Sequence, residues 1–163
     1  MGYTHYWRQN RDFTDAEWEE FVRLTNLIIA DNEGILSDGF GDGGKPEVNG
    51  DRVWFNGLGE DSHETFLITK KKGEAFDFCK TARKPYDKYV VAVLCALYNL
   101  TDSPPQQNRS AHPMEKISSD GNTSDWTDGL FHSVRSTRKE SMVCPIRDVV
   151  CLSYVDYLDR EAS

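Results

Sequence analysis

The N-terminal part of the chain contains one strand pattern followed by one helix pattern. Side chains alternate in character over residues 4–8, with His5 and Trp7 on one face, which predicts a short strand. A capping box formed by Thr14 and Glu17 then precedes apolar residues spaced three and four apart. This combination predicts an amphipathic helix over about residues 15–30.

Strands separated by turns are predicted in the middle of the chain. The pair Asn49-Gly50 lies between two strand-like runs and is typical of a two-residue hairpin turn with positive φ at both positions. Alternating patterns over residues 63–69 and 75–81 extend this hairpin into a meander. The glycine-rich stretch 39–44 predicts a flexible loop without regular structure.

The second half of the chain predicts further helices around a long polar loop. Pro85 opens a helix with one apolar stripe, residues 101–115 read as a loop, and a short strand lies near Ile117. Thr123 or Ser124 caps a third, short helix. The segment 146–158 fits a helix, which we favour, although a strand fits it nearly as well.

The order of these elements predicts an α+β fold with one mostly antiparallel sheet and helices packed on one face. A length of 163 residues with 38% hydrophobic residues indicates a single domain over residues 1–163 and excludes a disordered or membrane-spanning chain.

Charge and cysteine content narrow the classes of function. The formal net charge of −8 argues against general binding to the nucleic acid backbone. The four cysteines form no C-x-x-C pair, and the first residues lack the pattern of an export signal, so we expect reduced thiols and a cytoplasmic location without membrane association. The histidines and carboxylates lack helical ligand spacing, so neither a metal nor another cofactor is expected.

A basic segment interrupts the acidic chain where a predicted strand leads into a predicted helix. Lys80, Arg83 and Lys84 lie in this segment with Thr81. The first turn of a helix offers unpaired N–H groups and a partial positive charge, and arginine binds phosphate in a bidentate manner. The segment therefore predicts a phosphate site, with a solvated basic turn as the alternative.

Aromatic and amide side chains elsewhere are candidates to recognise the rest of such a ligand. His5 with Trp7, or Trp54, is suited to stack on a base, while Asn56 and Asp120 are suited to hydrogen-bond its edge. The alternatives are a hydrogen-bonded core histidine at His5 and ordinary turns at Asn56 and Asp120.

An enzymatic alternative also exists. His63-Glu64-Thr65 is similar to one half of a two-histidine phosphoesterase, but the chain has no second copy of the pattern. A phosphoesterase or nucleotide hydrolase would then use His5 or His63 with Glu64 or Asp120. Cys79, beside a cation near a helix start, is a weaker candidate for a nucleophile than for a buried structural thiol.

Several segments resemble a group of small uncharacterised proteins of bacteriophages and bacteria. The similar segments are Met1–Trp7, Phe55–Gly57, Cys79–Asp87 and Ser119–Gly121. The resemblance implies a phage or host-defence context but no established activity. It also implies that the following residues belong to one shared feature: His5, Asn56, Lys80, Thr81, Arg83, Lys84 and Asp120.

These observations predict a protein that sequesters a small phosphorylated ligand. The ligand expected is a nucleotide or a nucleotide-derived immune signal, bound in phage counter-defence. The alternatives are the hydrolase described above and an acidic protein that inhibits a host effector through the surface around residues 12–33. The sequence leaves the oligomeric state open.

Overall fold

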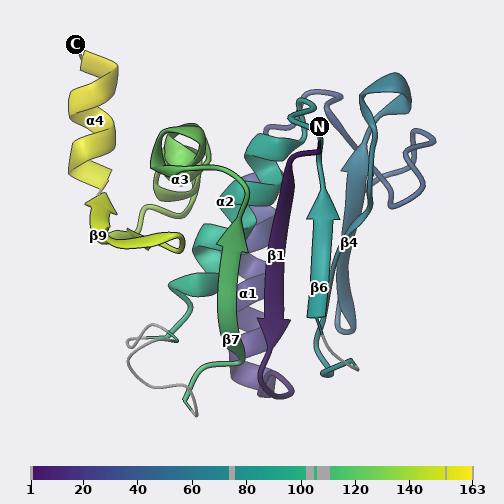
Figure 1. Ribbon diagram of the computed structural model, residues 1–163, viewed down its shortest axis with the longest axis horizontal. Helices are drawn as coiled ribbons and strands as arrows, with labels where there is room; N and C mark the ends of the chain where they lie inside the picture. Colours follow the sequence, from purple (N-terminus) through teal and green to yellow (C-terminus); the bar gives the residue numbers. More distant parts are fainter. Residues whose placement is uncertain (1, 74–75, 102–104, 106–110, 153, 163) are drawn as a thin grey trace.

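The computed structural model describes residues 2–73, 76–101, 105, 111–152 and 154–162, which form antiparallel strands and helices (Figure 1). The α+β class predicted from the sequence is therefore confirmed. The strands are β1 (Thr4–Gln9), β2 (Leu36–Ser37), β3 (Glu47–Val48), β4 (Arg52–Gly57), β5 (Phe66–Thr69), β6 (Phe76–Lys80), β7 (Met114–Ser119), β8 (Met142–Cys144) and β9 (Arg147–Leu152). The helices are α1 (Asp15–Ile29), α2 (Asp87–Tyr98), α3 (Thr123–Thr137) and α4 (Tyr154–Ala162), with a 3₁₀ turn η1 (Gly59–Asp61).

The strands form separate ladders rather than the single sheet predicted. In the first ladder β1 lies between β6 and β7, in the second β4 pairs with β2, β3 and β5, and in a third β8 pairs with β9. The predicted meander therefore ends at β5, because β6 pairs with β1 instead. This pairing places Cys79 beside His5 on one inward face. A backbone bond of 3.2 Å from Glu64 N–H to the Lys80 carbonyl joins the first two ladders where β5 and β6 approach each other.

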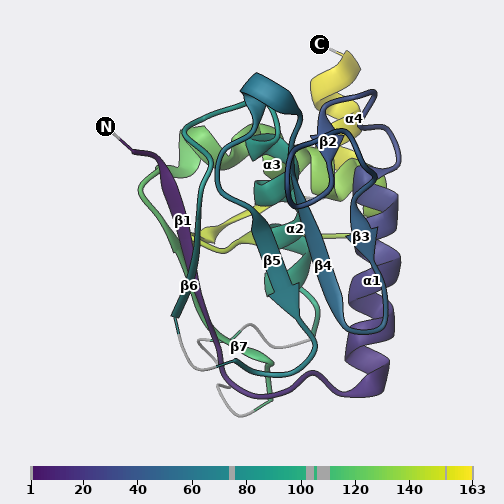
Figure 2. The same cartoon turned by 90° about the vertical axis from the view of Figure 1, so that its right-hand side faces the viewer.

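The helices α1 and α2 lie together on one side of the strands, and among the described residues no helix covers the opposite side, which is called the uncovered side below (Figure 2). The helix α1 has the capping box expected from Thr14 and Glu17, and it buries Trp18, Phe21 and Leu24. These side chains belong to one core that includes residues of the strands and of the other two large helices. Burial of this apolar surface is the main stabilising contribution to the fold.

The helix α2 is buried on every side, rather than along the one stripe predicted. All residues from Tyr89 to Tyr98 are buried, because α1, α3 and the strands surround the helix. Gly129 of α3 permits the close approach, since a Cβ at that position would overlap the side chain of Val91. A glycine that weakens the helix signal in the sequence is thus explained by helix packing.

The hairpin between β3 and β4 was predicted correctly, but its turn was not. The register pairs Val48 with Val53, and Asn49 N–H bonds the Arg52 carbonyl, so the two loop residues are Gly50 and Asp51. Neither has a positive φ. The side chain of Asn49 accepts hydrogen bonds from both Asp51 N–H and Arg52 N–H, and this local side-chain cap replaces the expected turn.

The C-terminal prediction of a helix over residues 146–158 is wrong for its first half. Residues 147–152 form β9, which pairs with β8, and the helix α4 begins at Tyr154. The third helix also differs, since it is capped by Asn122 and continues to Thr137. Most of the loop predicted over residues 101–115 lies outside the described residues, and its last two residues belong to β7.

Candidate ligand-binding site

The basic segment before α2 forms a tight turn against the start of β1. Ala82 and Arg83 have positive φ values of 51° and 59°. Thr81 N–H and Ala82 N–H both donate to the Tyr3 carbonyl, at 3.1 and 3.2 Å. These two backbone donors are therefore already used within the fold, and they are not free to bind an anion.

The three cations of this turn point in different directions. The Arg83 guanidinium lies 4.0 Å from the ring centre of Tyr3 and donates to Asp125 at 2.7 Å, which lowers the pKa of that carboxyl group. The Lys84 ammonium donates to the Glu60 carbonyl at 3.1 Å. The Lys80 side chain passes close to Gly2. The cations do not converge around one cavity.

His5 lies in a buried polar network at the same end of the strands. Its Nε2–H donates to Asp87 Oδ1 at 2.6 Å, and Asp87 Oδ1 also accepts from the Thr81 hydroxyl at 2.5 Å. Its Nδ1 is hydrogen-bonded to Ser119 Oγ at 2.8 Å, and Ser119 Oγ accepts from Gly121 N–H. His5 is 0% exposed. This network joins β1, β6, β7 and α2, and it matches the core-histidine alternative.

Asn56 and Asp120 both form hydrogen bonds that hold turns. The Asn56 amide donates to the His63 carbonyl at 2.9 Å and accepts from His63 N–H at 3.0 Å, and its side chain is buried. Asp120 accepts from Thr4 N–H at 3.1 Å and donates its own N–H to the Thr4 carbonyl. The structure thus brings Asp120, Thr81 and His5 to one end of β1 but keeps Asn56 in a separate turn.

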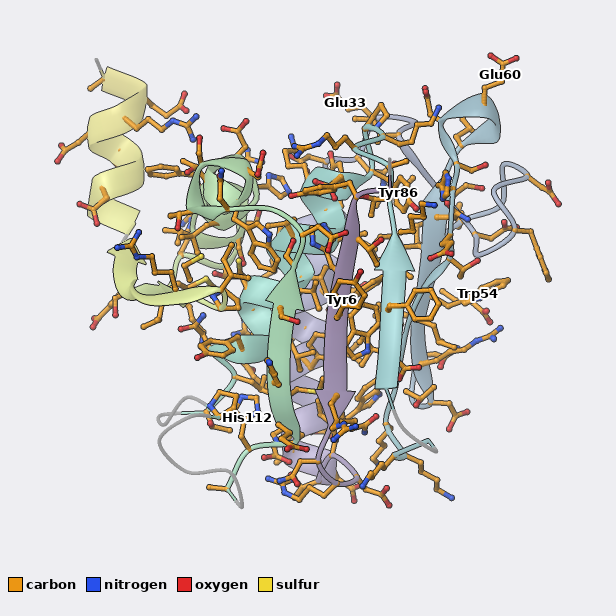
Figure 3. All side chains as sticks on the ribbon, viewed as in Figure 1. Tyr6, Glu33, Trp54, Glu60, Tyr86 and His112 are labelled. Carbon is orange, nitrogen blue, oxygen red and sulfur yellow. The ribbon has the colours of Figure 1, made fainter. Side chains whose placement is uncertain are left out.

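The two candidate tryptophans differ in exposure. Trp7 is 2% exposed and packs edge-on against Phe66 in the core. Trp54 is half-buried on the other side of the strands, where the Arg52 guanidinium lies 4.3 Å from its ring centre and Phe40 packs against it. Figure 3 shows Trp54 and Tyr6 on the uncovered side of the strands.

A groove with a volume of about 310 Å³ lies between β5 and β6 on this uncovered side. Trp7 contributes to its lining, and the exposed side chains around it are Phe40, Leu67 and Phe78. Phe78 is 51% exposed although it is a large apolar residue. A volume of this size falls at the lower end of the range for small-molecule sites.

The groove belongs to a larger outer face with aromatic and basic side chains. The register of the antiparallel strands places Tyr6 beside Phe78, and it places Arg8 beside Lys116. Tyr6, Arg8 and Lys116 line a second groove of about 230 Å³ that also reaches Trp7. Lys80 follows two residues after Phe78 and therefore projects from the same side of β6.

Sequence reasoning missed Phe78, Leu67, Phe40 and Asp77 as residues of this groove. The alternation along β6 contained the signal for Phe78, because an inward Cys79 requires Phe78 and Lys80 to point outward. No local pattern indicates that β5 and β6 leave a groove between them.

The residues of the enzymatic alternative are held in separate interactions. His63 is exposed, whereas His5 is fully buried. The Glu64 carboxylate accepts from Lys80 N–H at 2.6 Å. Burial raises the pKa of the Cys79 thiol to about 12, so this thiol is protonated at neutral pH and is a poor nucleophile.

The acidic surface around residues 12–33 is largely paired with cations. Asp15 pairs with Lys70, and Asp31 pairs with Arg135. Glu17 and Glu20 are bound by Arg11 and Arg23. These pairs reduce the negative field that a basic partner would meet there.

Within the described residues, no group of three or more potential metal ligands is found, and no helix is long and apolar enough to span a membrane. Comparison of the chain with family models, curated proteins and solved structures gives no match.

Proposed function

We propose that this protein binds a small phosphorylated, nucleotide-like ligand on the outer face of its strands, with the base in the groove between β5 and β6. The observation that carries the proposal is the exposed Phe78 ring at a groove that also contains Trp54. Exposed aromatic side chains on an uncovered sheet face are suited to stack on a base. The phage or host-defence context implied by the sequence resemblance is consistent with a nucleotide-derived signal as the ligand.

The position of Lys80 supports a phosphate next to this groove. Lys80 and Phe78 project from the same side of β6, about 7 Å apart along the strand. The Lys80 ammonium has no hydrogen-bond or ion-pair partner among the described residues, whereas Arg83 and Lys84 are engaged with Asp125 and Glu60. The Lys80 side chain lies against Gly2, so a phosphate that it binds would lie at that end of the strands. Among the sequence candidates, Lys80 is the cation whose ammonium is left for a phosphate.

The proposal is tested by thermal unfolding in the presence of mononucleotides and cyclic dinucleotides. A ligand at about 100 times its Kd adds about 2.7 kcal/mol of stability, which raises the Tm of a chain of this size by roughly 5 to 10 °C. Phe78→Ala should weaken binding roughly 5- to 150-fold, because stacking contributes about 1 to 3 kcal/mol per base. Leu27→Ala is the matched control, since Leu27 is 41% exposed on α1 and lies away from the groove.

Three outcomes would contradict the proposal. The first is the absence of a Tm shift with every nucleotide tested. The second is unchanged affinity in Phe78→Ala. The third is recovery of the incubated nucleotide with an altered mass, which indicates turnover and therefore the hydrolase alternative.

A further inference from the structure

The groove between β5 and β6 contains one carboxylate, that of Asp77. Asp77 lies beside Trp7 in the antiparallel register, so its side chain leaves β6 on the side of Trp7, whereas Phe78 leaves on the outer side. Both residues line the groove because β6 is an edge strand and the groove lies along that edge. Its carboxylate has no hydrogen-bond or ion-pair partner among the described residues. Among the described residues that line the groove, Asp77 is the only charged one.

The surroundings of Asp77 are mainly apolar. The groove presents the Phe78, Trp54 and Leu67 side chains, and the hydroxyl of Thr65 is already donated to the Gly39 carbonyl at 2.6 Å. The Asp77 residue is exposed, and the partial desolvation of its carboxyl group at the groove raises the pKa of that group. A partly desolvated carboxylate gains more from a hydrogen-bond donor than a fully hydrated one.

An ionised carboxylate is an acceptor at both oxygens, so it selects a partner with two adjacent donors. Guanine has this pattern on its Watson–Crick edge, where N1–H and the N2 amino group lie side by side. Adenine instead presents one donor next to an acceptor, and hypoxanthine lacks the amino group. A site built around such a donor pair rejects analogues that lack one member.

We propose that Asp77 makes the groove selective for guanine, accepting N1–H and N2–H from the edge of a base that stacks on Phe78. This inference rests on the proposed function and specifies its ligand class as a guanine nucleotide. Lys80 is three residues further along β6, about 10 Å away along the strand, so the phosphate lies away from the Asp77 charge.

The test compares GMP, IMP and AMP by isothermal titration. GMP and IMP differ by the N2 amino group alone, and the loss of one hydrogen bond to a charged acceptor should weaken IMP binding about 10- to 100-fold. AMP should bind at least as weakly as IMP. In Asp77→Asn, the amide matches the donor and acceptor of adenine, so the preference should shift from GMP toward AMP. Asp51→Asn, an exposed carboxylate outside the groove, should keep the wild-type preference.

The outcomes separate this inference from the proposed function. If GMP, IMP and AMP bind the wild-type protein with equal affinity, or if Asp77→Asn keeps the preference for GMP, the role of Asp77 is refuted and nucleotide binding stands. If none of the three nucleotides binds, the inference fails together with a mononucleotide site. The urea unfolding midpoint of Asp77→Asn should equal that of the wild type, which excludes misfolding as the cause.

Discussion

The hydrogen-bonded pair of His5 and Asp87 should contribute strongly to the stability of the folded protein. Asp87 accepts hydrogen bonds from His5 Nε2 and from the Thr81 hydroxyl, and His5 and Thr81 are both 0% exposed. Asp87→Ala leaves these two donors without a partner in the core. A buried donor left without its acceptor costs about 1 to 3 kcal/mol, so the loss of both bonds should cost roughly 3 kcal/mol. This is a large fraction of the roughly 5 to 15 kcal/mol that stabilises a typical domain.

Asp15→Ala is a matched control, because Asp15 and Asp87 are each the first residue of a helix. Asp15 is 89% exposed at its side chain and pairs with Lys70 on the surface. Its removal should cost much less stability than the removal of Asp87, because solvent screens both the helix dipole and an exposed ion pair.

Urea unfolding measured by tryptophan fluorescence gives both free energies. A loss of about 3 kcal/mol in Asp87→Ala corresponds to a fall in Tm of roughly 6 to 12 °C for a chain of this size. If Asp87→Ala loses no more stability than Asp15→Ala, the network is not a stabilising element of the core and the reasoning is refuted.

Three further predictions concern pH, helix packing and the thiols. Burial lowers the pKa of His112 and of His132 below the ordinary 6.5, so the folded state binds fewer protons than the unfolded state. The free energy of unfolding measured in urea should therefore decrease from pH 7.5 to pH 5.5. The variant His112→Asn should show a smaller decrease. Gly129→Ala should cost about 1 to 3 kcal/mol in urea unfolding because its methyl group meets Val91, whereas Gly50→Ala, where no atom lies within 4 Å, should have little effect. In the variant Cys151→Ser, a thiol reagent at pH 8 should label the buried Cys79, Cys95 and Cys144 slowly in the folded protein and rapidly after denaturation. Rapid labelling of the folded protein would show that these thiols are accessible.

The pH prediction follows from the hydrogen bonds of His112. Its Nε2–H donates to the Tyr98 carbonyl at 3.1 Å, and its Nδ1 accepts from Met114 N–H at 2.9 Å. Protonation of Nδ1 breaks the second bond inside the core. Carboxyl groups with lowered pKa values, such as Glu17, titrate below 4.5 and do not contribute in this window. Constant stability between pH 7.5 and 5.5 would contradict the neutral state of both rings.

Elements with local signals were predicted from the sequence, and elements defined by distant pairing were not. The helix α1 carries its own cap and apolar spacing, so the sequence predicts it within one residue at its C-terminal end. The pairing of β6 with β1 joins Lys80 to Thr4 across most of the first half of the chain. Neighbouring strands usually pair, which is why a meander was the default expectation.

For the candidate site too, local patterns predicted some features, and features that depend on distant segments were missed. Alternation correctly places His5 and Trp7 on one face of β1, and that face is the buried one. Whether His5 and Trp7 could bind a ligand depends on which face of β1 the helices cover. No local sequence pattern around β1 indicates that face. The Asp77 carboxylate, which has no partner among the described residues, was harder still to predict as a site residue. The groove that it lines lies between two strands that belong to different ladders.

The burial of α2 on every side from Tyr89 to Tyr98 has a consequence for how the protein is made. Residues 87–98 leave the ribosome before residues 123–137, which form α3 and cover one side of this helix. Until residues 123–137 have been translated, the apolar surface of residues 87–98 is exposed on the nascent chain, where it can bind chaperones or aggregate. A premature stop codon in this interval should therefore yield a product that is degraded rather than one that is merely less active.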